Sequence, residues 1–331
     1  MGYNVYVTRR LPQEALDMVR NACETVEINP EDRPLTRAEL LDKVRARDGI
    51  LSLLTDTIDE EVMRAAEGAR GFANYAVGYN NIDVPKATEL GLVITNTPGV
   101  LTEATADLAW TLLMATARRI AESDRFMRTG KFESWAPMLF LGADVTGRTL
   151  GLVGAGRIGS AVARRSRGFD MKVLYCDPIA NEALEKELGA RRVALDELLA
   201  AADFVSVHVP LNEQTHHLFG AEQFRRMKRT AIFVNTSRGP IHDETALVEA
   251  LRSGEIAGAG LDVYEDEPAM KPGLADLDNT VLVPHIGSAT IWTRTRMATM
   301  AAENLIAIVK GEKAPNCVNP EVYEKARGAK R

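Results

Sequence analysis

The sequence predicts an α/β protein with parallel sheets and two domains. The chain has 331 residues, about twice the length of a typical domain. Short runs rich in Val, Ile, Leu and aromatic residues alternate with patterns of helical period, which is typical of parallel strands joined by helices. The alternation restarts at residue 149 after a long helical stretch, and this restart indicates a second sheet.

The first series of elements covers the N-terminal part of the chain. We expect strands at residues 4–7, 49–54, 72–77 and 93–95, and helices at residues 12–22, 59–66 and 84–90. One long helix is expected next, over residues 101–128. Thr102 can cap its first turn, and Glu103 and Asp107 place negative charge near its N-terminus.

The second series has strands at residues 149–153, 172–176, 204–209, 231–235, 258–263 and 280–283, and a further long helix follows at residues 291–310. That last helix comes after the second sheet is complete, so it can return to the first one. We therefore expect a central domain, residues 101–288, inserted in a discontinuous outer domain, residues 1–100 and 289–331. The two long helices would form the connections.

Composition and charge exclude several classes of partner. Lys and Arg number 40 and Asp and Glu number 46, a net charge of −6, which disfavours binding to nucleic acid or to anionic lipid. The longest apolar run, residues 108–117, is too short to span a membrane. Three widely spaced cysteines form neither a disulfide framework nor a metal-ligand pattern. We expect a cytoplasmic protein with small-molecule partners and no metal.

A glycine-rich motif follows the first strand of the second series. Gly154 permits a tight turn, Gly156 lets the backbone approach a pyrophosphate, and Gly159 allows close packing of the next helix. Asp177 ends the following strand, where a carboxylate would bind both ribose hydroxyls. Its charge would repel a 2′-phosphate, and residues 179–185 contain no Arg or Lys. The motif predicts a dinucleotide site that favours NAD(H) over NADP(H).

Three further polar side chains follow hydrophobic strands, at the sheet edge where α/β proteins bind ligands. Arg238 offers the planar donors that suit a carboxylate. His285 next to a carboxylate would form an acid–base pair suited to neutral pH. Glu267, Glu265 and Asp266 all compete for the role of that carboxylate, and spacing does not choose among them.

Nine short blocks of sequence are spread along nearly the whole chain. They begin at Ala76 (AVGYNNIDV), Asn96 (NTP), Thr105 (TADLA), Gly154 (GAGRIG), Val209 (VPL), Asn235 (NTSRG), Gly258 (GAGLDVY), Glu267 (EP) and Pro284 (PHIGS). In these blocks and in their order the chain resembles the D-isomer-specific 2-hydroxyacid dehydrogenases, and most closely their glyoxylate/hydroxypyruvate reductase branch. The resemblance implies a Rossmann-type nucleotide-binding domain inserted in a discontinuous flavodoxin-like substrate domain, usually in a homodimer.

The resemblance also implies a catalytic triad of Arg238, Glu267 and His285, because the family's glutamate directly precedes a proline. It implies that the backbone N–H groups of Val77 and Gly78 bind the substrate carboxylate. The expected cofactor contacts are Thr105, Gly154, Gly156, Arg157, Ile158, Gly159, Asp177, Pro178, Val209, Pro210, Thr215, Thr236, Ser237, Asp262, His285 and Ser288, and the expected substrate contacts also include Leu53, Arg238 and His285.

The expected activity is NAD(H)-dependent reduction of a small 2-oxo acid, glyoxylate or hydroxypyruvate, to the D-2-hydroxy acid. Some similar reductases carry a basic residue after the second strand and use NADPH, whereas this chain has Asp177 and Pro178 there. Alternatives are a dehydrogenase for D-lactate or phosphoglycerate and a phosphite dehydrogenase. An NAD-responsive corepressor-like binding protein is the alternative from another class.

Overall fold

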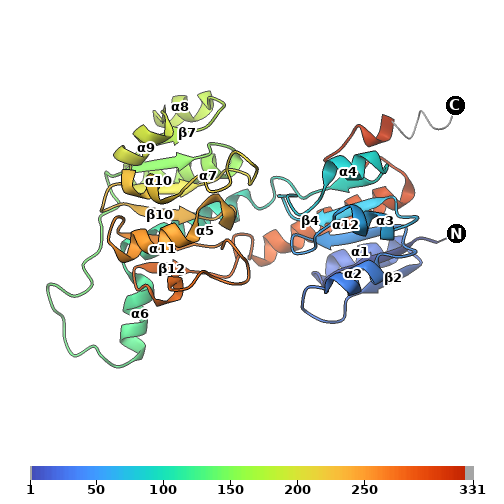
Figure 1. Cartoon of the computed structure of the whole chain (residues 1–331), viewed down its shortest axis with the longest axis horizontal. Helices are drawn as coiled ribbons and strands as arrows, with labels where there is room; N and C mark the ends of the chain where they lie inside the picture. The colour runs from blue at the N-terminus through green and yellow to red at the C-terminus, as the bar shows by residue number, and fades with distance from the viewer. Residues whose placement is uncertain (1, 325–331) are drawn as a thin grey trace. The chain divides into compact units, whose positions relative to one another are not determined.

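The computed structural model of the chain describes residues 2–324. The chain divides into two compact units, Met1–Leu101 with Ala289–Arg331 and Thr102–Ser288. Residues 325–331, the end of the expected outer domain, lie outside the described part. Both units are built from parallel strands and helices (Figure 1), and the predicted α/β fold class is confirmed.

The first unit holds a parallel sheet of five strands within the described residues, in the order β2-β1-β3-β4-β5. This is the flavodoxin-like strand order. Helices α1 and α12 pack on one face, and α2, α3 and α4 pack on the other. The elements are β1 (Asn4–Val7), α1 (Gln13–Ala22), β2 (Thr25–Ile28), α2 (Arg37–Lys43), β3 (Gly49–Leu53), α3 (Glu60–Ala65), β4 (Gly71–Tyr75), α4 (Val84–Glu89), β5 (Val93–Thr95) and α12 (Ile291–Lys310).

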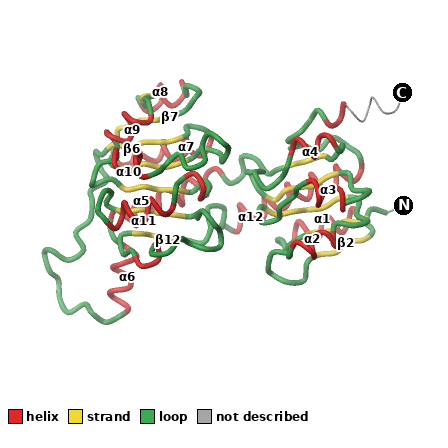
Figure 2. Tube along the Cα trace, in the orientation of Figure 1, coloured by secondary structure: helices red, strands yellow, loops and turns green. Residues whose placement is uncertain are grey.

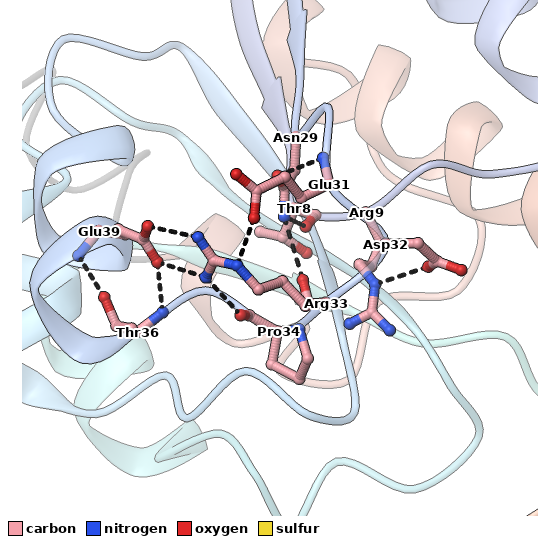
Figure 3. A network of polar contacts seen from close by, with 9 residues as sticks. All are labelled: Thr8, Arg9, Asn29, Glu31, Asp32, Arg33, Pro34, Thr36 and Glu39. Carbon is pink, nitrogen blue, oxygen red and sulfur yellow. Dashed lines mark hydrogen bonds and ion pairs between the residues drawn. The ribbon is translucent and has the colours of Figure 1, made fainter.

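Strand β2 and helix α2 are not among the elements expected from the sequence. A network of polar contacts holds the loop between them (Figure 3). The guanidinium of Arg33 donates to both carboxylate oxygens of Glu39, at 2.8 and 2.7 Å. Glu39 and Thr36 form a capping box, which satisfies two free N–H groups at the start of α2.

The second unit holds a parallel sheet of seven strands among the described residues, in the order β12-β11-β10-β9-β6-β7-β8. Helices α5, α7 and α8 pack on one face and α9, α10 and α11 on the other. The elements are α5 (Thr102–Ala117), α6 (Ile120–Arg128), β6 (Thr149–Val153), α7 (Arg157–Arg165), β7 (Lys172–Cys176), α8 (Glu182–Leu188), β8 (Arg191–Arg192), α9 (Leu195–Ala201), β9 (Phe204–Val207), α10 (Ala221–Arg226), β10 (Ile232–Asn235), α11 (Glu244–Arg252), β11 (Gly258–Leu261) and β12 (Thr280–Leu282).

The order of the second sheet reverses at β6, which pairs with β7 on one side and with β9 on the other. This is the Rossmann arrangement, and such a reversal opens a crevice at the carboxyl ends of the two strands on either side. The glycine-rich turn follows β6 and therefore lies at this crevice.

The prediction of one helix over residues 101–128 is wrong. Helix α5 ends at Ala117, and α6 begins at Ile120 after Arg119, whose φ is 53°. A left-handed residue breaks the helical hydrogen-bond ladder. Helix α5 buries side chains such as Leu112 and Leu113 in the core, whereas α6 buries none, so no core contact keeps the two segments on one axis.

Candidate active site

The glycine-rich turn leaves open space in front of α7. An ideal Cβ on Gly154, whose φ is 97°, would lie 2.6 Å from the carbonyl oxygen of His208, and one on Gly159 would lie 2.1 Å from that of Gly154. The packing of the protein itself therefore requires these two glycines. A Cβ on Gly156 would meet no atom within 4 Å. The open space fits a phosphate group at the helix N-terminus, where the first N–H groups have no partner within the helix.

Asp177 lies beside this turn, at the end of β7. Its Oδ2 accepts from the N–H of Ala155 at 2.8 Å, and its Oδ1 accepts from the N–H of Ile179 at 2.9 Å. Each carboxylate oxygen has a second lone pair, so the group can still accept hydrogen bonds from ribose hydroxyls. Asp177 and the open space at the glycine-rich turn thus fit a bound dinucleotide.

Arg192 is a basic neighbour of Asp177 that the sequence analysis missed. Its Nε donates to the carbonyl oxygen of Asp177 at 2.9 Å, and its Nη2 donates to that of Pro178 at 2.6 Å. It lies in β8, a strand of only two residues that pairs with β7. The pair of arginines at 191 and 192 is the available signal, and it lies beyond residues 179–185, the segment directly after Asp177.

The loops after β11 and β12 bring an imidazole and a carboxylate together. Nδ1 of His285 lies 2.9 Å from Oε2 of Glu267. The other carboxylate oxygen, Oε1, accepts from the N–H of Tyr264 at 3.1 Å. His285 has a φ of 53°, and its N–H donates to the carbonyl oxygen of Asp262 at 3.0 Å. Within residues 2–324, no hydrogen bond involves Nε2 of His285, so this nitrogen is available to a ligand.

Glu265 and Asp266, the other two candidates for the carboxylate next to His285, contact other side chains. Glu265 lies 3.0 Å from Nε2 of His217, and it accepts from the N–H of Glu244 at 3.1 Å. Asp266 forms an ion pair with Lys271 at 2.7 Å. Spacing along the chain left the choice open, and the geometry places only Glu267 next to His285.

Charges around Glu267 keep its carboxyl ionised at neutral pH. Burial raises its pKa, but the hydrogen bond and charge of His285, the N–H of Tyr264 and the charge of Arg238 lower it, and the net pKa is below the usual value. Burial lowers the pKa of Arg238, while the charge of Glu267 raises it. An arginine stays protonated in proteins all the same.

Arg238 follows β10, at the same edge of the sheet. Its Nη1 donates to the carbonyl oxygen of Ser237 at 2.7 Å, and the carbonyl oxygen of Arg238 accepts from Nδ2 of Asn235 at 2.9 Å. A Cβ on the next residue, Gly239, would lie 1.8 Å from the carbonyl oxygen of Tyr264. Only glycine therefore allows the loops that carry Arg238 and Glu267 to approach this closely.

Asp262 is a second buried acid at this edge, with 1% of its surface exposed. It accepts from the N–H groups of Ile286 and Gly287 at 2.6 and 2.8 Å, and Oγ1 of Thr105 donates to the carbonyl oxygen of Gly287 at 3.2 Å. Burial raises the pKa of Asp262. Thr105, Asp262 and the loop leading to Ser288 are thus brought together.

The remaining expected cofactor contacts follow β9 and β10. Cγ1 of Val209 would lie 3.0 Å from a Cβ on Gly154, so Val209 borders the glycine-rich turn. Oγ1 of Thr215 donates to the carbonyl oxygen of Pro210 at 2.6 Å. Thr236 is buried, and its Oγ1 has no hydrogen-bond partner among the described residues.

The expected substrate contacts Leu53, Val77 and Gly78 belong to the first unit, in the loops after β3 and β4. Asn96 and Asn74 donate their side-chain amides to the carbonyl oxygens of Val77 and Gly78, at 2.8 and 3.0 Å. No hydrogen bond within the described residues uses the N–H groups of these two residues. The loop therefore presents two backbone donors to a ligand.

Within residues 2–324, no group of three or more His, Cys, Asp and Glu side chains could hold a metal ion. None of the helices in that range combines the length and apolar character needed to cross a bilayer.

Comparisons with known proteins agree with this geometry. Residues 110–287 match the model of the D-isomer specific 2-hydroxyacid dehydrogenase, NAD binding domain. The chain is 55% identical to a glyoxylate reductase of Korarchaeum cryptofilum over 98% of both chains. A crystal structure of a protein from Thermus thermophilus is 46% identical, with a TM-score of 0.88 over 95% of this chain and 99% of that one.

A further solved structure is that of an NADPH-dependent glyoxylate/hydroxypyruvate reductase from Sinorhizobium meliloti, in complex with citrate. It is 32% identical, with a TM-score of 0.81 over 96% of this chain and 97% of that one. The resemblance found in the sequence is confirmed by these matches, which extend over nearly the whole chain. The protein belongs to the D-isomer-specific 2-hydroxyacid dehydrogenases, a family of oxidoreductases, and its second unit is a domain that binds a nicotinamide dinucleotide.

Proposed function

We propose that the protein reduces glyoxylate or hydroxypyruvate to the corresponding D-2-hydroxy acid, with NADH as the preferred cofactor. The observation that carries the proposal is the His285–Glu267 pair at 2.9 Å, at the same sheet edge as Arg238 and the glycine-rich turn. The name of the 55% identical relative supports glyoxylate as the substrate.

In this proposal three side chains of the second unit act on the substrate. Arg238 binds the carboxylate of the 2-oxo acid. The family resemblance gives the backbone N–H groups of Val77 and Gly78 as further donors to a substrate carboxylate. His285 donates the proton on Nε2 to the carbonyl oxygen, and Glu267 holds the ring and stabilises its positive charge. When bound, the nicotinamide cofactor supplies the hydride. One hydride and one proton convert the carbonyl group to a hydroxyl group.

The residues around the glycine-rich turn would hold the cofactor. The N–H groups of Arg157 and Ile158 start α7 and would face the pyrophosphate. Asp177 would accept hydrogen bonds from the ribose hydroxyls, and its charge supports NADH over NADPH. Asp262, with Thr105 and Ser288 nearby, would lie at the nicotinamide end. The further contacts proposed here are Pro178, Val209, Pro210, Thr215, Thr236 and Ser237.

We also infer that the protein is a homodimer. Helix α6 is followed by a loop of residues 129–148 (Figure 2). Large apolar side chains are exposed on this helix and along this loop. Trp135 is 80% exposed and Met138 is 76% exposed. An apolar segment of this size is typical of a protein interface, and a second copy of the chain would cover it. The other members of the set are Ile120, Met127, Phe132, Leu139 and Leu141.

The three cysteines support a cytoplasmic location, because none of them forms a disulfide and thiols persist in that compartment.

Oxidation of NADH, followed by its absorbance, tests the proposed activity. Glyoxylate, hydroxypyruvate, pyruvate and phenylpyruvate are compared, each with NADH and with NADPH. We expect the highest kcat/KM for glyoxylate or hydroxypyruvate with NADH. A higher value for pyruvate or phenylpyruvate would refute the proposed substrate, and a higher value with NADPH would refute the proposed cofactor preference.

A further inference from the structure

Arg192 places a positive charge on the turn whose Asp177 carboxylate is expected to reject a 2′-phosphate. Its guanidinium bridges the carbonyl oxygens of Asp177 and Pro178 at 2.9 and 2.6 Å. These carbonyls belong to the turn that carries the Asp177 carboxylate. The charge of Arg192 therefore lies at the adenosine end of the proposed cofactor site.

No acidic side chain within the described residues forms an ion pair with Arg192. The adjacent Arg191 differs, because its guanidinium pairs with Glu197 at 2.7 Å. A guanidinium has five N–H groups, and the two carbonyls occupy one on Nε and one on Nη2 of Arg192. Its remaining donors stay available to an anion.

Both carboxylate oxygens of Asp177 already accept backbone N–H groups, those of Ala155 and Ile179. These bonds hold the carboxylate toward the glycine-rich turn and spread its negative charge over two donors. Arg192 approaches the same turn through the carbonyl groups of Asp177 and Pro178. The turn thus carries a carboxylate suited to ribose hydroxyls, and its carbonyl oxygens bind a guanidinium suited to a phosphate.

We propose that Arg192 is a specificity-determining residue that binds the 2′-phosphate of NADPH, so that the protein uses NADPH as a second cofactor in addition to NADH. The inference rests on the proposed cofactor site. It changes what the sequence predicts at this position, because Asp177 then lowers the affinity for NADPH without excluding it.

Calorimetric titration of the protein with NADH and with NADPH tests the inference without any turnover. In Arg192→Ala we expect the Kd for NADPH to rise about tenfold, because the variant loses one charge-assisted hydrogen bond to the 2′-phosphate. The Kd for NADH should stay within about twofold, because NADH has no 2′-phosphate. In the unmodified protein, raising the salt concentration should weaken NADPH binding more steeply than NADH binding. In Arg192→Ala, salt should weaken the binding of the two cofactors to the same extent.

Two further variants separate charge from fold. Arg191→Ala, which removes the neighbouring guanidinium, should leave both dissociation constants unchanged. Arg192→Lys keeps the charge and should retain part of the NADPH affinity. Equal weakening of both cofactors in Arg192→Ala would show that the residue only holds the turn, and this outcome overturns the inference. Absence of NADPH binding to the unmodified protein overturns it as well, whereas absence of binding by both cofactors refutes the proposed site itself.

Discussion

Replacing Glu267 by glutamine keeps the size of the side chain and removes its negative charge. In the structure Oε2 of Glu267 lies 2.9 Å from Nδ1 of His285, and the two side chains are 33% and 28% exposed. The contact with His285 is one of the interactions that lower the pKa of the carboxyl. The contact therefore places a negative charge beside the imidazole ring.

The size of the effect follows from the exposure of the pair. A hydrogen bond to a charged group contributes about 1.5–3 kcal/mol, and partial exposure to solvent places this pair at the lower end. A loss of about 1.4 kcal/mol from the transition state corresponds to a fall of about tenfold in kcat/KM. We therefore expect Glu267→Gln to lower kcat/KM for glyoxylate about tenfold, because glutamine places no negative charge beside the imidazole ring.

The assay is kcat/KM for glyoxylate reduction, measured in the unmodified protein and in Glu267→Gln. The matched control is Glu265→Gln, because Glu265 forms the same kind of pair with His217 at 3.0 Å and has no proposed role in the reaction. We expect the control to keep the kcat/KM of the unmodified protein. An unchanged kcat/KM in Glu267→Gln, or the same fall in the control, would refute the reasoning.

Three further predictions concern the substrate, the glycine-rich turn and the dimer. In Arg238→Lys we expect kcat/KM for glyoxylate to fall about 10- to 100-fold, since an ammonium cannot form the paired bonds of a guanidinium; steady-state kinetics measure this, and an unchanged value would contradict the role. Gly159→Ala should lower the Tm, because its Cβ would lie 2.1 Å from a carbonyl oxygen. Gly156→Ala should keep the Tm and weaken NADH binding, because its Cβ enters the open space proposed for the cofactor. Thermal unfolding and titration measure the two effects, and a lowered Tm in Gly156→Ala with an unchanged Tm in Gly159→Ala would contradict this account of the turn. Trp135→Ser combined with Met138→Ser should weaken self-association in sedimentation experiments, and an unchanged dimer would place the interface elsewhere.

Most of the fold could be predicted from local sequence patterns. The strand, the glycine-rich turn and the start of α7 are consecutive in sequence. The packing of the protein requires Gly154 and Gly159, and Gly156 leaves space for a ligand, so a local motif can express all three. The helix break at Arg119 has no such signal, because neither a glycine nor a proline stands there. Strand β2 was missed because it is short and partly exposed at the edge of its sheet, so it lacks the buried pattern of the central strands.

The candidate site shows the same limit. The sequence placed Arg238, Glu267 and His285 after strands, but the pairing of Glu267 with His285 depends on how two separate loops approach each other. The residues alone do not choose among Glu265, Asp266 and Glu267 as the carboxylate next to His285, and the family resemblance selects Glu267. Arg192 was missed because it reaches Asp177 through the pairing of β8 with β7, a contact between segments that are distant in sequence.

The central claim is that His285 donates the proton while the rest of the site binds cofactor and substrate. Its most direct test compares the unmodified protein with His285→Ala, measuring kcat for glyoxylate reduction and the Kd for NADH on the same preparations. We expect kcat to fall by about 10²- to 10⁴-fold, the usual contribution of a general acid. The Kd for NADH should rise by less than about tenfold, because His285 is only one of many expected cofactor contacts. A variant that reduces glyoxylate at the unmodified rate would contradict the claim.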